Sequence, residues 1–316
     1  LGPCAGIRTV QGVPSSSLQL PQPAATPRQL ASGRHPMIPL LDVWSRSPLS
    51  DLSNVEIVLL SVLAFGVAYV SGMVGMALGV VRFPLLIAFG ISVPIAAGVN
   101  LAVSVVTAVT SGLEHWKNHR IAFRVVLLIG VPSFIGAFFG SLASDLIRVW
   151  ILLSIITLVL LWSGLVALAR ALRTRESGEV RDQSIQLPLP STRRLILEIT
   201  VGFLIGVLGG AVGLVLGTVR MPALVNVLKL HPAIAIGTNT IIGLLVGASG
   251  FVGKLINGDV DILLIALLGT TGMVGSYLGA RRTGQMNTNN LRLAIGIVLI
   301  IVAPFMGVRA AIEFPN

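Results

Sequence analysis

The chain has 316 residues, of which 54% are hydrophobic and 11% are charged, and its formal net charge at pH 7 is +10. A water-soluble domain carries about 25% charged residues, so the composition excludes a soluble globular protein and indicates a membrane protein. Strict alternation of apolar and polar residues is absent, which disfavours a β-barrel and leaves membrane-spanning α-helices. The basic residues lie in short loops and polar segments without interleaved aromatic residues, so we expect no nucleic-acid partner.

The N-terminal segment, residues 1–50, is rich in Pro, Ser, Gln and Arg and shows no hydrophobic periodicity. This composition predicts a disordered tail. The chain does not begin with Met, so two further interpretations of this segment stay open. It contains either a wrongly assigned start, with Met37 as a plausible true start, or a targeting segment.

Ten apolar segments follow in two sets of five. We predict a first transmembrane repeat over residues 51–170, a basic cytoplasmic linker over 171–194 and a second transmembrane repeat over 195–316. A membrane-spanning helix needs about 20 apolar residues. The first two segments of each set are short and interrupted by glycine, so each pair predicts two crossings or one crossing with a re-entrant half helix. The segments are 55–71, 73–91, 95–114, 121–143, 147–170, 196–211, 212–228, 232–252, 260–280 and 291–311.

The two sets contain an internal repeat. The stretch Gly72–Pro84 reads GMVGMALGVVRFP and the stretch Gly210–Pro222 reads GAVGLVLGTVRMP, with glycines, arginine and proline at the same spacing. Further matches follow in the same order, which predicts a duplicated structural unit. They include Pro94 with Pro232, Asn100 with Asn239, Gly136 with Gly275 and Gly140 with Gly279.

Loop charges predict that the two repeats are inverted relative to each other. The linker is the most basic segment and is therefore expected in the cytoplasm. Counting crossings from it places the loop with Lys117 and Arg124 inside. The corresponding loop of the second repeat is net acidic, and the basic loop there contains Arg281, Arg282 and Arg292. The excess of basic residues lies in non-corresponding loops of the two repeats. If all basic loops are cytoplasmic, each repeat must have an odd number of crossings. We favour five plus five over four plus four.

Arg82 and Arg220 are the first candidate functional residues, because each lies inside an apolar segment. A charge at the centre of a membrane helix costs about 2.5–3.5 kcal/mol on insertion scales, so it is retained where it faces a cavity or a partner. The guanidinium fork suits an oxyanion. In an inverted repeat, the two arginines approach one site near the midplane. The alternative is that each snorkels to an interface or binds a carbonyl at a helix break.

The glycines of the repeated stretch fall at positions i, i+3 and i+7, which predicts one helical face. They serve either close helix packing or a break that exposes backbone N–H groups to an anion. We take Gly75, Gly79, Gly213 and Gly217 as candidate substrate-binding positions. Polar side chains near the start of later apolar spans are candidate cavity-lining groups, with interhelical hydrogen bonding as the alternative. They are Asn100, Thr238 and Asn239, and Ser104 and Thr107 follow Asn100 at helical spacing.

His115 and His119 are four residues apart beside Glu114, which could place two metal ligands on one helix face. The sequence offers no third matched ligand and no HExxH motif, so we predict no metal site and no enzyme activity. A membrane-embedded metal-dependent enzyme and a non-transporting scaffold are the alternative functions.

The duplicated Gly-x-x-Gly-x-x-x-Gly-x-x-Arg-x-Pro stretch, followed by Pro and Gly-x-Asn, resembles the sulfite exporter TauE/SafE family over roughly residues 55–311. The resemblance implies a multi-pass secondary transporter of the cell membrane. It would export sulfite, organosulfonates or related small anions without a cofactor. The coupling ion, H⁺ or Na⁺, and a homodimeric state stay open.

Overall fold

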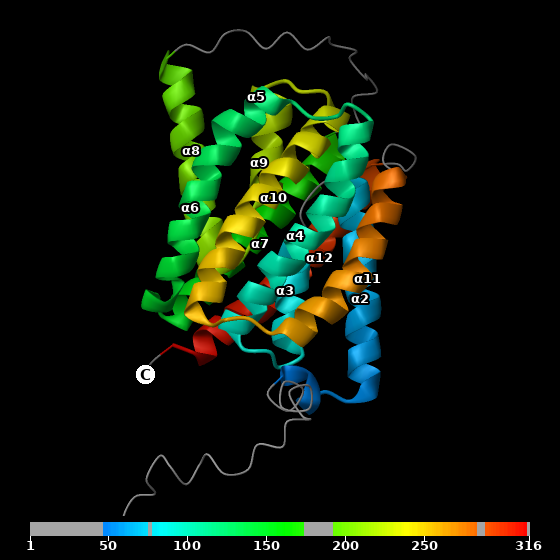
Figure 1. Ribbon diagram of the computed structural model, residues 1–316, viewed down its shortest axis with the longest axis vertical. Helices are drawn as coiled ribbons and strands as arrows, with labels where there is room; N and C mark the ends of the chain where they lie inside the picture. Colours follow the sequence, from blue (N-terminus) through cyan, green and yellow to red (C-terminus); the bar gives the residue numbers. More distant parts are fainter. Residues whose placement is uncertain (1–46, 75–77, 174–191, 283–287, 315–316) are drawn as a thin grey trace, which may run out of the picture. The chain divides into compact units, whose positions relative to one another are not determined.

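The computed structural model describes residues 47–74, 78–173, 192–282 and 288–314, which all belong to one compact unit, Val43–Asn316. All regular secondary structure assigned in these residues is helical (Figure 1). The predicted disordered tail and most of the predicted linker lie outside the described residues.

The helices follow the two sets of apolar segments. The first set contains α2 (Asn54–Val74), α3 (Gly79–Ala88), α4 (Val93–Lys117), α5 (Phe123–Val125), α6 (Val131–Leu142) and α7 (Val149–Arg173). A π-helical turn, η3 (Val126–Gly130), joins α5 to α6 without a break. The second set contains α8 (Thr192–Val212), α9 (Gly217–Pro222), its π-helical continuation η5 (Ala223–Val227), α10 (Pro232–Asn257), α11 (Ile262–Arg281) and α12 (Thr288–Ile312). Of two short 3-10 helices, η2 (Pro48–Asp51) precedes α2 and η4 (Ala143–Leu146) follows α6.

Seven of the described helices are long and apolar enough to cross a membrane. They lie within Asn54–Met73, Val93–Lys117, Phe123–Leu146, Val149–Ala169, Leu195–Val212, Pro232–Asn257 and Ile262–Arg281. Large apolar side chains such as Val58, Phe139 and Leu158 are exposed on these helices. Such a surface is stable only against lipid. The protein is therefore an all-α, multi-pass membrane protein, as the composition predicted.

The glycine-rich stretches are discontinuous, as expected. One helix ends at Val74 and the next begins at Gly79, and the second set repeats this break between Val212 and Gly217. The helix α3 has 10 residues, or about 15 Å, half the thickness of a bilayer's hydrocarbon core. The expectation that these glycines share one helical face is wrong for the second stretch, because Gly213 has a φ of +74° and ends the helix.

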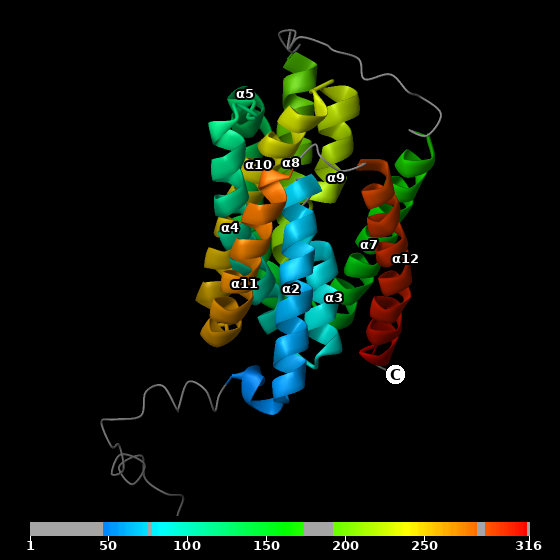
Figure 2. The same cartoon turned by 90° about the vertical axis from the view of Figure 1, so that its right-hand side faces the viewer.

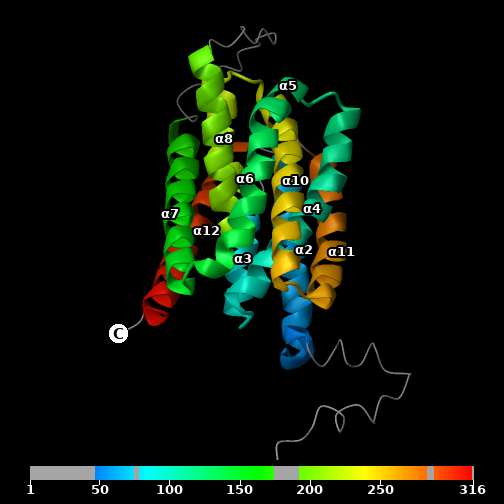
Figure 3. The ribbon, with the colours of Figure 1, turned by 60° about the vertical axis from the view of Figure 1, so that its left-hand side comes forward.

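Helices from different sets pack against each other through glycine. A Cβ atom on Gly275 or Gly279 of α11 would overlap the backbone carbonyl of Phe65 or Tyr69 of α2, so these two helices run parallel. Gly136 and Gly140 of α6 contact α8 at Phe203 and Val207 in the same manner (Figure 3). These four glycines serve close packing, because a side chain on any of them would separate the helices.

Corresponding helices of the two sets pack antiparallel. Gly98, near the start of α4, contacts Asp259 just beyond α10, whereas Gly112 near the end of α4 contacts Ile241. In α7 and α12, which lie side by side in Figure 2, Gly164 contacts Ile300 and Thr157 contacts Gly307. A two-fold axis in the membrane plane would produce these pairings. The inverted repeat stays a prediction, and these pairings support it.

The helix α10 is five residues longer than the predicted segment 232–252. It ends at Asn257, where Gly258 takes a left-handed conformation with a φ of 82°. Lys254, which the sequence pattern places in a loop, therefore lies in the last turn of a helix and is buried, with a relative exposure of 2%. The sequence boundary is wrong because this isolated lysine interrupts the apolar pattern without ending the helix.

Candidate functional site

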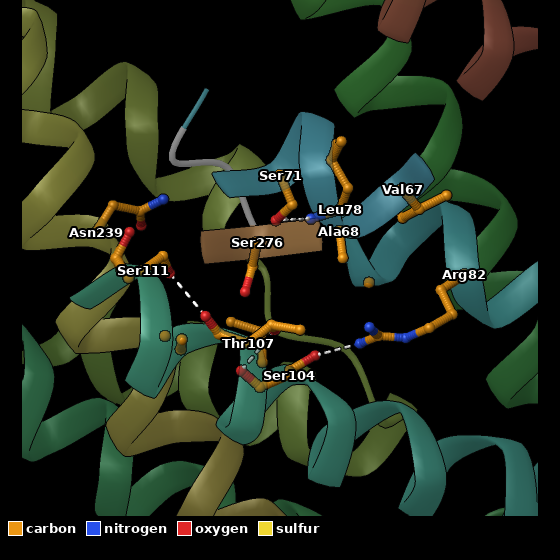
Figure 4. A pocket seen from close by; sticks show the side chains of 15 residues that line it. Val67, Ala68, Ser71, Leu78, Arg82, Ser104, Thr107, Ser111, Asn239 and Ser276 are labelled. Atoms are coloured by element: carbon orange, nitrogen blue, oxygen red, sulfur yellow. Dashed lines mark hydrogen bonds between the residues drawn. The ribbon is translucent and has the colours of Figure 1, made fainter. Parts of the chain in front are cut away.

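A narrow cavity lies among helices from both sets (Figure 4). Its free space is about 30 Å³, which is room for one or two water molecules. Among its described lining residues, Arg82 is the charged one, and six carry hydroxyl groups. The polar lining residues are Ser71, Arg82, Ser104, Thr107, Ser111, Asn239, Thr240 and Ser276. A closed space with a cation, hydroxyl donors and no carboxylate in this lining favours a small anion.

Arg82 is the fourth residue of α3 and is only 4% exposed. Its Nε donates to Asn100 Oδ1 at 2.9 Å. Its Nη2 donates to the carbonyl oxygen of Asn100 at 2.9 Å and to Ser104 Oγ at 2.7 Å. The half helix α3 is thereby attached to α4 through the Nε and Nη2 groups of Arg82.

Asn100 also joins the first set of helices to the second. Its Nδ2 donates to the carbonyl oxygen of Gly213, in the break between α8 and α9, at 2.9 Å. Two glycines make room for this contact: a Cβ on Gly79 would come within 3.1 Å of the Asn100 amide, and one on Gly213 would overlap Ala97. We call Gly79, Ala97, Asn100 and Gly213 the central seam.

Arg220 is the fourth residue of α9 and is 2% exposed. Its Nε donates to Asn239 Oδ1 at 3.3 Å, and Asn239 Nδ2 donates to the carbonyl oxygen of Gly217 at 3.3 Å. The terminal nitrogens Nη1 and Nη2 of Arg220 are buried, and neither has an acceptor among the residues that the structure describes. A buried guanidinium with two unused donor groups is uncommon, because each unpaired group costs free energy.

The candidate residues from the sequence fall into three groups. Arg82, Gly79 and Asn239 line the cavity. Asn100, Arg220, Gly213 and Gly217 lie next to it, bonded to its wall or to one another. Thr238 does not reach it: its Oγ1 accepts from the backbone N–H of Ala122, in the connection between α4 and α5, at 2.9 Å. Gly75 lies outside the described residues.

Several cavity residues escaped the sequence reasoning. Ser111 continues the row of Ser104 and Thr107 along one face of α4, a spacing that the sequence does contain. Ser71 and Ser276 come from α2 and α11, whose pairing no local pattern shows. Gly243 in α10 also lines the cavity, and as a glycine inside an apolar helix it gave no signal of its own.

A second cluster of charges lies where α10 ends. Lys254 Nζ donates to Asp259 Oδ2 at 2.6 Å and lies 3.7 Å from Asp145 Oδ1 of the first set. These three residues border a cavity of about 210 Å³ that also reaches Val93 and Ala97 of α4. Along α4, therefore, Asn100 lies between this cavity and the central one.

The histidine pair does not form a metal site in the described part of the chain. His115 is fully buried in the last turns of α4, and His119 lies beyond the helix end with a φ of 53°. No group of three His, Cys, Asp or Glu side chains with metal-binding geometry occurs among the described residues. The sequence spacing suggested a shared face, but the helix ends at Lys117 before it reaches His119.

Comparisons with known proteins agree with the transporter interpretation. The model of the sulfite exporter TauE/SafE family matches residues 60–306. "Probable membrane transporter protein YunE" of Bacillus subtilis (strain 168) is 26% identical over 262 residues, which are 78% of this chain and 95% of the relative. "Probable membrane transporter protein YtnM" of the same organism is 28% identical over 242 residues, 74% of this chain and 76% of the relative. No solved structure matches the chain significantly.

Proposed function

We propose that this chain, which belongs to the sulfite exporter TauE/SafE family, is a secondary transporter that exports a small sulfur-containing oxyanion such as sulfite or an organosulfonate. The observation that carries the proposal is the central cavity between the two sets of helices, with Arg82 as the charge in its described lining. A buried cation among hydroxyl groups, with no carboxylate beside it, attracts an anion and repels a cation.

The helix break adds to this attraction. Leu78 and Gly79, at the N-terminal end of α3, line the cavity. The positive end of the helix dipole therefore lies at the same space as Arg82. Half helices that point their N-termini at an anionic substrate are a known arrangement in transporters built from inverted repeats.

We infer an alternating-access mechanism from the two cavities. They lie on either side of Asn100 along α4, and the hydrogen bond from Asn100 to Gly213 joins the two sets of helices at this position. The central cavity has room for one or two water molecules only, so a sulfite ion enters only when the surrounding helices move apart. Rocking of one set of helices against the other would open one cavity and close the other.

Efflux of sulfur-labelled sulfite from proteoliposomes tests the proposal. Arg82→Gln removes the charge of the cavity and should lower the flux at least tenfold. The reason is that the attraction between two unit charges about 4 Å apart is worth about 4 kcal/mol near a protein surface, and about 1.4 kcal/mol is a factor of ten. Arg281→Gln is the control: Arg281 is exposed at the end of α11, and this variant should keep the wild-type flux.

Competition with unlabelled sulfate, thiosulfate, methanesulfonate and acetate identifies the substrate class, and imposed H⁺ or Na⁺ gradients identify the coupling ion. The proposal fails if folded wild-type protein gives no more flux than protein-free vesicles with every anion of this panel. It also fails if a cation is moved in place of the anions.

A further inference from the structure

The two arginines share one hydrogen-bond partner by type and differ at another. Each donates from Nε to the Oδ1 of an asparagine, Asn100 for Arg82 and Asn239 for Arg220. Four residues after Asn100 comes Ser104, which accepts from Arg82 Nη2 at 2.7 Å. Four residues after Asn239 comes Gly243. The second set therefore lacks the hydroxyl group that would accept from its arginine, and both terminal nitrogens of Arg220 have no acceptor among the described residues.

We propose that the unused fork of Arg220 is the binding group for the oxyanion, with two of its oxygens accepting from Nη1 and Nη2 at the place that Gly243 leaves open. This inference rests on the proposed function and refines its site. Arg82 then has a different role, because its Nε and Nη2 already donate to α4. It positions α3 and supplies positive charge to the cavity.

The geometry around Gly243 carries the inference. Gly243 lines the central cavity. A Cβ atom on it would lie 4.0 Å from Arg220 Nη2. Gly243 therefore lies both on the cavity and close to the guanidinium group of Arg220.

The position of Asn239 is consistent with an anion that reaches Arg220 from the central cavity. In Figure 4, Asn239 and Arg82 lie on opposite sides of the cavity, and Asn239 is the direct hydrogen-bond partner of Arg220. An anion in the cavity therefore lies between the charge of Arg82 and the fork of Arg220. The planar fork selects ligands with two oxygens at the spacing of a sulfite, sulfonate or carboxylate group.

The substitution Gly243→Ser tests the inference by adding the hydroxyl group that the first set already has. Its Oγ should accept from Arg220 as Ser104 does from Arg82, so sulfite must compete with an internal acceptor. We expect the affinity for sulfite, measured by calorimetry on purified protein, to fall at least tenfold. Gly243→Ala is the matched control. Its methyl group lies 3.2 Å from Val215 Cγ1 and fills part of the same space without offering an acceptor, so the loss of affinity that it causes measures the steric effect alone. We expect the loss in Gly243→Ser to exceed this steric loss at least threefold.

Arg220→Lys provides a second measurement if the serine variant does not fold. It keeps the positive charge and loses the fork. We expect the preference for sulfite and methanesulfonate over chloride, a spherical anion, to fall at least tenfold. A variant that keeps the wild-type preference would overturn the inference.

The outcomes separate the inference from the function on which it rests. If wild-type protein neither binds nor moves any anion of the panel, the proposed function fails. If wild-type protein binds and moves sulfite, but Gly243→Ser and Gly243→Ala have equal affinities, the function stands and the assignment to Arg220 fails. A selective loss in Gly243→Ser supports both.

Discussion

Buried charges in this protein occur in two environments. Arg82 and Arg220 lie beside the central cavity, where hydrogen bonds to uncharged groups or an expected anion compensate their burial. Lys254 lies where α10 ends, and two carboxylates compensate its burial instead. The difference follows from position: a helix end is close to loops that can supply acidic residues, whereas the centre of the membrane is not.

The ion pair of Lys254 should stabilise the fold. In Lys254→Met, Asp259 loses a partner at 2.6 Å and Asp145 one at 3.7 Å. Breaking a buried pair costs about 3–5 kcal/mol, and we expect about 2 kcal/mol here because Asp145 is half exposed. Thermal unfolding in detergent should show a lower midpoint. The control Lys117→Met, at the exposed end of α4, should leave it unchanged. A midpoint equal to wild type in Lys254→Met would show that the pair contributes nothing.

At the scale of elements, glycine decides how closely the helices approach. The pairs α2–α11 and α6–α8 each place glycines of one helix on backbone carbonyls of the other. In the membrane, such contacts replace the hydrophobic effect as the source of helix association, because lipid tails are as apolar as leucine. The same residue type has another role in the central seam, where Gly213 allows the backbone to turn back between α8 and α9.

The substitution Gly279→Val tests the packing role. A Cβ at this position would overlap the backbone carbonyl of Tyr69, so α2 and α11 must separate, at a cost of about 1–3 kcal/mol or more. We expect a lower unfolding midpoint and a smaller monodisperse fraction in gel filtration. Gly66→Val is the control on α2, because nothing lies within 4 Å of its added Cβ. Equal behaviour of the two variants would contradict the assigned packing role.

At the scale of the whole molecule, the arrangement of helix pairs determines which loops share a side of the membrane. The α4–α5 connection and the end of α11 lie at one end of the helices, and the α6–α7 connection lies at the other (Figure 1). The excess of basic residues predicts that the first of these ends is cytoplasmic.

Single cysteines in a Cys4→Ser background test this orientation with an impermeant thiol reagent on intact cells. Leu146→Cys, at a residue that is 87% exposed next to the α6–α7 connection, should react from outside. Asn118→Cys and Arg282→Cys should react only after the membrane is permeabilised. Reaction of Arg282→Cys from outside, with Asn118→Cys protected, would contradict the inverted five-plus-five topology.

Much of the fold follows from local properties of the sequence. Composition determined the membrane class, because 11% charged residues cannot cover a soluble globule. The apolar segments predicted the helices to within a few residues, and the repeated glycines predicted the breaks before α3 and α9. Arg82 was a good candidate because burying a charge in an apolar membrane segment costs free energy whatever the arrangement of the helices.

The tertiary structure decided which groups meet, because the direction of a side chain depends on the helix packed beside it. Asn100 and Gly213 are 113 residues apart in sequence, and no local pattern predicts their hydrogen bond. Thr238 and Asn239 are neighbours in the chain, yet one bonds the α4–α5 connection and the other bonds Arg220. The repeat made the two arginines look alike. Only the packing of α3 on α4 shows that Nη2 of Arg82 has acceptors in Ser104 and in the carbonyl group of Asn100. Only the packing of α9 on α10, where Gly243 stands in the place of Ser104, shows that both terminal nitrogens of Arg220 have no acceptor among the described residues.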